Sequence, residues 1–265
     1  MKHLVPVCAL ALSLVAAIGT AQADSVEVDV ALVLAVDISR SMDPDEQALQ
    51  RQGYIDAFRA PAVHDAIDKG AIGSIAIVYM EWAGADNQRV VVPWTILEGA
   101  EDSVAFAERL AANPPPVGAP RTSISGAIDY AVALLETSAF EAVRRVIDVS
   151  GDGPNNQGRP VTHARDAALA KGITINGLPI MLQRPTSVWD IQDLDLYYRD
   201  CVIGGAGAFM IPVREPQQFA EAIRTKIIRE IATIGDDAPE VVLAQAEQGA
   251  NCFVGEARSR QWSPY

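Results

Sequence analysis

Cysteine and positive charge are both scarce in this chain of 265 residues. Three cysteines are too few for a disulfide-stapled scaffold or a zinc-cluster protein. The 34 acidic residues outnumber the 21 basic ones, and the formal net charge of -13 argues against nucleic acid or anionic membranes as partners. Aromatic residues make up only 6%, but hydrophobic residues reach 49%. The chain is therefore expected to fold around a sizeable core.

The first 23 residues have the pattern of a signal peptide. Lys2 provides a positive start, residues 4–18 are apolar, and residues 21–23 (Ala-Gln-Ala) form a small-x-small cleavage pattern. We predict cleavage before Asp24 and an exported mature chain, periplasmic or secreted. A single-span anchor is the weaker alternative, because the apolar run is short for a hydrocarbon core of about 30 Å. No later segment is apolar enough to cross a bilayer, so we expect no membrane span in the mature chain.

We divide the chain into a signal peptide (1–23), one folded domain (24–234) and a polar C-terminal tail (235–265). After export only Cys201 and Cys252 remain, in a compartment that permits disulfides. A bond between them would tie the tail to the domain, and closing such a loop contributes about 4 kcal/mol in the chain-entropy model. Two unpaired thiols are the alternative.

Apolar runs that suit buried strands alternate with segments of helical period. The expected strands are Val28–Val36, Ser74–Met80, Val143–Val149 and Ile173–Leu178, with Val90–Pro93 as an edge strand that pairs in a hairpin. The expected helices include one capped by Asp43 with Pro44 and Glu46 following, one with the stripe Ile124, Ile128, Ala131 and Leu135, the segments Ala164–Ala170 and Ser187–Asp200, and a last one with the stripe Phe219, Ile223, Ile227 and Ile231. This alternation predicts an α/β fold: a doubly wound, mostly parallel, Rossmann-like sheet with one antiparallel edge strand and helices on both faces.

Oxygen-bearing side chains occur at three places where such a fold binds ligands, beyond the carboxyl ends of its strands. Asp37, Ser39 and Ser41 follow the first strand and alternate, so they lie on one side of an extended segment. Thr122 precedes a helix, and Asp152 lies between two glycines after a strand. Hard cations such as Mg²⁺ prefer oxygen ligands. The five residues therefore predict a divalent cation site, with one position left for an anionic oxygen from outside.

Each of these motifs also has an ordinary structural explanation. The Asp-x-Ser-x-Ser segment suits a turn before the next helix, Thr122 suits a helix cap, and Asp152 suits a glycine-flanked turn. Their joint occurrence at strand ends and a helix start favours the cation site.

The order Asp37-x-Ser39-x-Ser41, Thr122, Asp152 resembles the metal-ion-dependent adhesion site of the von Willebrand factor type A domain. The flanks resemble that family too: residues 31–36 its first strand, residues 121–128 its threonine loop and helix, and residues 146–153 its fourth strand and aspartate turn. The likeness covers about Val28 to Ile234. Residues 151–156 and 172–180 are similar to an exported bacterial branch of unknown function.

The resemblance implies a role for each residue of the motif. Ser39 and Ser41 would bind the cation directly, Thr122 directly in the partner-binding state, and Asp37 and Asp152 directly or through water. Mg²⁺ is the expected ion, with Mn²⁺ and Ca²⁺ as alternatives, and the last position would accept an Asp or Glu of a protein partner. Gly151 departs from the family, since many relatives carry a side chain there.

Enzymatic activity is the second hypothesis. His64 and His163 are the only histidines after cleavage, and neither fits a nucleophile-elbow pattern. A Mg²⁺-dependent hydrolase or phosphatase that uses Asp37 and Asp152 needs a general base, and the three loops contain no lysine or histidine. We therefore expect a protein-binding domain and no enzyme. A purely structural metal site is the third hypothesis.

Overall fold

The computed structural model describes residues 25–116, 118–182, 191–232 and 249–262. The predicted signal peptide (1–23) lies outside the described residues, as do residues 235–248 of the predicted tail.

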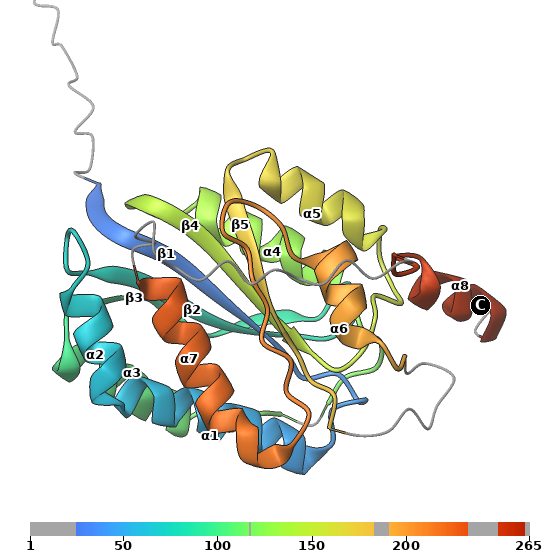
Figure 1. The fold of residues 1–265 in the computed structure, drawn as a ribbon, viewed down its shortest axis with the longest axis horizontal. Helices are drawn as coiled ribbons and strands as arrows, with labels where there is room; N and C mark the ends of the chain where they lie inside the picture. Colours follow the sequence, from blue (N-terminus) through green and yellow to red (C-terminus); the bar gives the residue numbers. More distant parts are fainter. Residues whose placement is uncertain (1–24, 117, 183–190, 233–248, 263–265) are drawn as a thin grey trace, which may run out of the picture.

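A five-stranded sheet forms the centre of the molecule, in the order β3-β2-β1-β4-β5 (Figure 1). The strands β1 (Val26–Asp37), β2 (Ile75–Trp82), β4 (Phe140–Gly151) and β5 (Ile173–Pro179) are parallel, and β3 (Gln88–Leu97) pairs antiparallel with β2 at one edge. This confirms the predicted fold class. The carboxyl ends of all four parallel strands meet at one edge of the sheet, where ligands bind in such folds.

Helices cover both faces of the sheet (Figure 1). In β1, Leu32 and Leu34 belong to one apolar core, whereas Ala31, Val33 and Ala35 belong to the other. A strand buried on both faces is apolar at nearly every position, which accounts for the continuous run in the sequence. The first core is shared with α1 (Pro44–Arg59), α2 (Pro61–Asp68), α3 (Ala100–Ala111) and α7 (Phe219–Ile231), and the second with α4 (Ile124–Glu136), α5 (Val161–Leu169) and α6 (Leu194–Tyr197).

The start of α1 is held by the predicted capping box. The Asp43 carboxylate accepts hydrogen bonds from the backbone N–H groups of Asp45 and Glu46, both at 2.8 Å. Glu46 in turn accepts one from the Asp43 N–H at 2.9 Å. Because both partners of this exchange are satisfied, the loop that follows β1 is fixed where it enters α1.

The predicted apolar stripes of α4 and α7 are buried, as expected from their spacing. The helix α3 was not predicted. For the helix expected over Ser187–Asp200, residues 183–190 lie outside the described residues, and the described part is the single turn α6 followed by a π-helical turn, η1 (Tyr198–Val202).

Cys201 in η1 and Cys252 form a disulfide, with their Cα atoms 5.4 Å apart, which confirms the predicted pairing. A further helix, α8 (Val254–Trp262), follows within the segment expected to be a polar tail. Across the described ranges, no helix combines the length and the apolarity needed to cross a bilayer.

Candidate metal site

Asp37 is the last residue of β1, and its side chain is completely buried. Its Oδ1 accepts a hydrogen bond from the Ser39 N–H at 2.6 Å. Its Oδ2 is buried and has no hydrogen-bond partner among the described residues. Buried carboxylate oxygens are normally satisfied, so an unpartnered one calls for a ligand or another explanation.

Ser39 and Ser41 continue from Asp37 along the same side of the chain. Their hydroxyl oxygens lie 2.8 Å apart, and the Ser41 hydroxyl donates to Asp152 Oδ1 at 2.7 Å. Since a hydroxyl donates only one hydrogen, the Ser39 hydroxyl donates to Ser41. The structure thus joins four of the five predicted residues in one hydrogen-bonded chain, which we call the Asp37–Asp152 chain.

Thr122 is buried at the same edge of the sheet. Its N–H donates to Asn156 Oδ1 at 2.9 Å, and its carbonyl oxygen accepts from the Asn156 N–H at 2.8 Å. The next residue, Ser123, donates its N–H to Ala83 O just beyond the end of β2. The backbone therefore places Thr122 beside the end of β2, whereas within the described residues its hydroxyl is not part of the Asp37–Asp152 chain.

The backbone next to Thr122 adopts an unusual conformation. Arg121 has a φ of 72°, and no other non-glycine residue in the described part of the chain has a positive φ. This conformation costs free energy for a residue with a side chain, and such strain is often found at functional sites.

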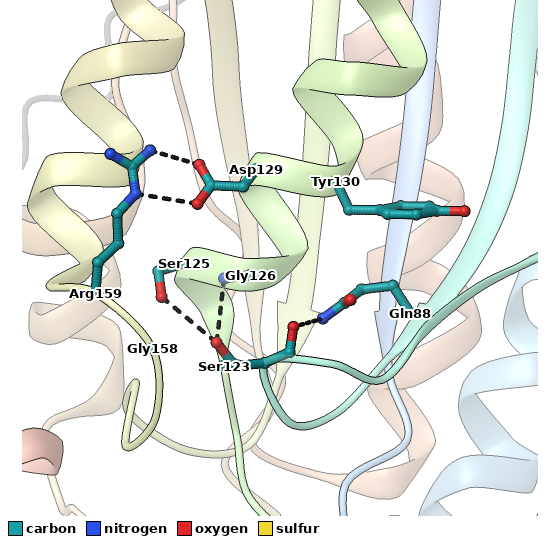
Figure 2. Close-up of a pocket in the computed structure, with 9 residues that line it drawn as sticks. Gln88, Ser123, Ser125, Gly126, Asp129, Tyr130, Gly158 and Arg159 are labelled. Carbon is teal, nitrogen blue, oxygen red and sulfur yellow. Dashed lines mark hydrogen bonds and ion pairs between the residues drawn. The ribbon is translucent and has the colours of Figure 1, made fainter.

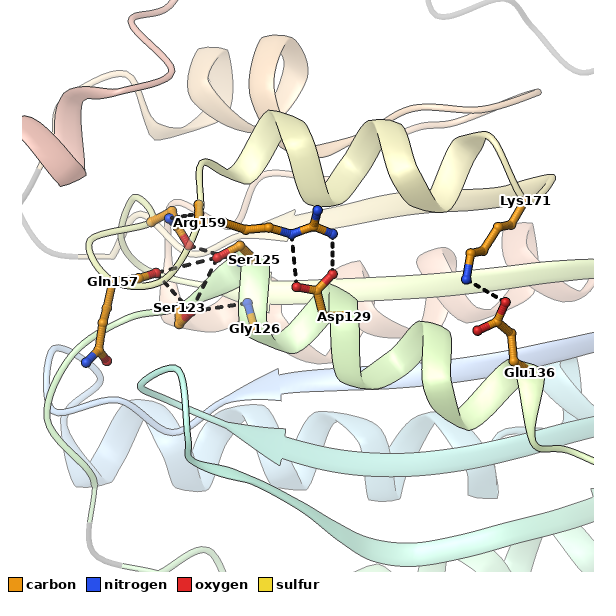
Figure 3. A network of polar contacts seen from close by, with 9 residues as sticks. Ser123, Ser125, Gly126, Asp129, Glu136, Gln157, Arg159 and Lys171 are labelled. Carbon is orange, nitrogen blue, oxygen red and sulfur yellow. Dashed lines mark hydrogen bonds and ion pairs between the residues drawn. The ribbon is translucent and has the colours of Figure 1, made fainter.

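The threonine loop is tied to the loop that follows Asp152. Figure 3 shows the Ser123 hydroxyl accepting from the Gly126 N–H at 3.1 Å and donating to Gln157 O at 2.9 Å. The Ser125 N–H donates to Asn155 Oδ1 at 2.9 Å. These bonds fix the two loops relative to each other.

A hollow of about 390 Å³ lies beside the threonine loop. Figure 2 shows the ion pair of Arg159 and Asp129 on one of its sides and Gln88 on another. The Asp129 and Arg159 side chains are about half exposed, so their pairing contributes little to stability.

Burial controls the charge of the two carboxylates. It raises the pKa of Asp37 to about 7, against the lowering effect of the Ser39 hydrogen bonds. Burial also raises the pKa of Asp152 well above its usual range, and the neighbouring Asp37 charge raises it further. A cation bound between two such carboxylates would relieve both the repulsion and the desolvation cost.

The residues fit a divalent cation by their chemistry. Two carboxylates and three hydroxyls supply only oxygen, which suits Mg²⁺, Ca²⁺ or Mn²⁺. The unpartnered Asp37 Oδ2 is the atom that most needs such a neighbour.

Sequence reasoning missed three residues around the site. The Gln50 Nε2 donates to Asp37 O at 3.3 Å, and its Oε1 is buried without a partner among the described residues. The negative charge of Glu46 adds to the rise in the Asp152 pKa. The Tyr198 hydroxyl donates to Gly151 O at 3.4 Å. One sequence signal could have indicated Glu46 and Gln50. The polar residues of α1 recur with helical spacing on one face, and the structure buries all of them: Glu46, Gln47, Gln50 and Arg51.

Tyr198 also packs against Gly151, the position at which we expected a departure from the family. A Cβ atom at Gly151 would lie 2.7 Å from Asp37 Oδ2 and 3.0 Å from the Tyr198 hydroxyl. Both distances are shorter than ordinary packing allows, so Asp37 and Tyr198 leave no room for a side chain at this position.

The fold is that of the von Willebrand factor type A domain, as three solved structures illustrate. Proximal thread matrix protein 1 from the mussel byssus is similar with a TM-score of 0.55 and 14% identity, over 78% of this chain and 50% of that one. The pilus adhesin SpaC of Lactobacillus rhamnosus GG, in its open conformation, is similar with a TM-score of 0.56 and 11% identity, over 79% of this chain and 30% of that one. A von Willebrand factor type A protein from Catenulispora acidiphila is similar with a TM-score of 0.52 and 16% identity, over 77% of this chain and 43% of that one.

The chain belongs to the family described as a protein of unknown function (DUF1194), whose match runs from residue 27 to residue 235. The predicted resemblance to a von Willebrand factor type A branch of unknown function is thereby confirmed. No curated protein matches the sequence. This chain spans about half the length of the mussel protein and about 30% of the pilus adhesin.

Proposed function

We propose that this protein binds a divalent cation, with Mg²⁺ as the first candidate, through Asp37, Ser39, Ser41, Thr122 and Asp152. The observation that carries the proposal is the buried, unpartnered Oδ2 of Asp37, a carboxylate whose Oδ1 begins a hydrogen-bonded chain that ends on a second carboxylate. A crystal structure of the mussel protein, at a TM-score of 0.51 and 12% identity, contains a zinc-occupied metal-ion-dependent adhesion site. That likeness supports a cation at the same edge of the sheet here.

The proposed role of the site is adhesion to a protein partner. A bound cation supplies a positive centre that attracts an anionic oxygen, and the donors of this chain consist of two carboxylates and neutral hydroxyls. Two carboxylates balance a divalent charge without exceeding it, so an Asp or Glu side chain of the partner is the expected additional ligand. Export of the mature chain belongs to this proposal, and the Cys201–Cys252 disulfide supports it because disulfides persist in oxidising compartments.

Replacing Asp37 by asparagine tests cation binding. Asparagine keeps the shape of the side chain but removes its charge, so we expect Asp37→Asn to weaken Mg²⁺ and Mn²⁺ binding at least about tenfold, the loss typical even of outer-shell changes. Calorimetric titration of the full chain with each cation measures this. Asp129→Asn is the matched control, because Asp129 is an exposed carboxylate near the threonine loop but outside the site. Equal affinity in wild type and Asp37→Asn would contradict the proposal.

Partner binding is tested separately from cation binding. Wild type and Asp37→Asn are immobilised and exposed to an envelope extract with Mg²⁺ or with a chelator. A partner of the proposed kind is retained only by wild type with Mg²⁺, and replacing its acidic contact residue by an amide abolishes retention. A protein that is retained equally with chelator does not use the site.

A further inference from the structure

The C-terminal segment 249–262 folds back onto the edge of the sheet that carries the candidate metal site. It lies beyond the family match, which ends at residue 235. The Cys201–Cys252 disulfide joins it to η1, and the Ala250 N–H donates to Asp200 Oδ2 at 2.7 Å. These two links fix the start of the segment beside α6 and η1, and α8 follows directly (Figure 1).

The helix α8 contacts both loops of the candidate site. Glu256 Oε1 accepts a hydrogen bond from Asn155 Nδ2 at 2.8 Å, and Arg121 Nη1 donates to the Ser259 hydroxyl at 3.2 Å. Gly255 packs so closely on the Asn155 carbonyl that a Cβ atom there would lie 2.0 Å from the oxygen. One helix thus holds the loop after Asp152 and the loop of Thr122 together.

Asn155 connects α8 to the predicted ligands. Its side chain is completely buried, and its Oδ1 accepts from the Ser125 N–H while its Nδ2 donates to Arg159 O and to Glu256. Its neighbour Asn156 exchanges two hydrogen bonds with the Thr122 backbone. The orientation of the Asn155 amide therefore bears directly on the position of the threonine loop.

Glu256 is a buried carboxylate whose burial costs free energy of folding. It is only 8% exposed, and its Oε2 has no hydrogen-bond partner among the described residues. A buried carboxylate costs free energy that one hydrogen bond to an amide only partly offsets. Its hydrogen bond to Asn155 gives it a positioning role.

We propose that α8 is a clamp for the cation site, and that Glu256 and Asn155 are positioning residues that keep Thr122 and Asp152 in their binding arrangement. The inference rests on the proposed cation binding and adds how that site is held. Glu256 fixes the Asn155 amide, Asn155 fixes the N-terminus of α4 through Ser125, and the disulfide keeps α8 in place.

Two substitutions at Glu256 test the clamp. Glu256→Ala removes the acceptor for Asn155 Nδ2, so we expect Mn²⁺ affinity in calorimetric titration of the full chain to fall about tenfold. Glu256→Gln keeps an oxygen acceptor of the same length and retains affinity close to wild type. Gln261→Ala, at an exposed position of the same helix, is the matched control and leaves the affinity unchanged.

Amide hydrogen exchange in chelator tests the clamp without any cation. The Ser125 N–H loses protection in Glu256→Ala and keeps it in Glu256→Gln. Wild-type affinity together with wild-type protection in Glu256→Ala overturns the clamp and leaves cation binding intact. Wild type that binds no cation overturns the proposed function itself. If Glu256→Ala does not fold, Cys252→Ser replaces it, because losing the tether of α8 must also weaken Mn²⁺ binding, and unchanged affinity there overturns the clamp.

Discussion

Burying the Asp37 carboxylate costs free energy of folding, because the charged group loses its contact with water. Burial raises its pKa to about 7, which means that the ionised form is disfavoured in the folded chain. In the proposed site, this carboxylate is already desolvated and is followed by the hydrogen-bonded Ser39 and Ser41, so cation binding would need little reorganisation. Under the proposed function, Asp37 lowers the stability of the cation-free protein, and a bound cation would offset that cost.

Gly151 is the residue whose replacement most directly tests this packing. A side chain there meets Asp37 Oδ2 and the Tyr198 hydroxyl, so we expect Gly151→Ala to lower the free energy of unfolding by about 1–3 kcal/mol, the usual cost of overpacking. Urea denaturation measures the loss. Adding Tyr198→Phe to this variant removes the crowded hydroxyl, so we expect the double variant to recover part of the lost stability.

Gly153 provides the control for this prediction. It lies in the same turn, but a Cβ atom there meets nothing within 4 Å. Gly153→Ala is therefore expected to retain wild-type stability. Equal losses in the two variants would show that the turn needs glycine for its backbone and that crowding by Tyr198 is irrelevant.

The helix α7 carries a second buried charged cluster, on the face of the sheet opposite α4. The Lys226 ammonium lies 2.8 Å from Asp148 Oδ1 and also pairs with Glu230, and the Asn176 amide donates to Glu230 Oε1 at 3.3 Å. If both carboxylates were ionised, the single ammonium group would leave one negative charge uncompensated, which favours keeping a proton on one of them. Burial and the Asp148 charge together raise the pKa of Glu230 to about 8, against the lowering effect of Lys226.

This cluster predicts how stability depends on pH. Because the folded chain holds the Glu230 proton more tightly than the unfolded chain, Glu230 favours folding below its ordinary pKa of 4.5, and this contribution is lost as the pH rises through about 8. Relative to Glu230→Gln, wild type loses stability between pH 5 and 8, with a slope of at most about 1.4 kcal/mol per pH unit. Urea denaturation in chelator at several pH values measures the difference.

An exposed glutamate on the same helix serves as the comparison. Glu221→Gln is the matched control, because it makes the same substitution on the same helix at a well-exposed side chain outside the cluster. If Glu230→Gln loses stability with rising pH just as wild type does, Glu230 does not titrate in this range and the prediction fails.

At the scale of the whole molecule, the disulfide and the sequence of residues 1–23 both agree with the proposed export to an oxidising compartment. The bond closes a loop with a sequence separation of 51 residues, which is worth about 4 kcal/mol in the chain-entropy model. That contribution is available only where the thiols stay oxidised. The sequence pattern of residues 1–23 predicts export to such a compartment.

Processing of the chain tests this directly. We expect the protein purified from the envelope fraction or the medium to begin at Asp24 and to contain Cys201 linked to Cys252. N-terminal sequencing and non-reducing peptide mass mapping check the two points together. A chain that keeps Met1, or that is recovered from the cytoplasm with both thiols free, would exclude export with cleavage.

The sequence by itself determined the fold and named the five residues of the candidate site. Strands buried on both faces, such as β1, are continuous apolar runs, and helices such as α4 and α7 show their buried faces as stripes, so both are visible in a single chain. The capping box at Asp43 is visible for the same reason, since its partners are three residues apart. These are local signals.

Only the tertiary structure decided which groups surround the site. Tyr198, Gln50 and the pair of Asn155 and Glu256 come from elements far apart in sequence, and neither the unpartnered oxygen of Asp37 nor the crowding at Gly151 is apparent before those elements pack. The helix α8 was missed because its contacts with the rest of the chain, and not an apolar stripe, hold it in place. Burial and long-range hydrogen bonds depend on the whole fold, and no local pattern encodes them.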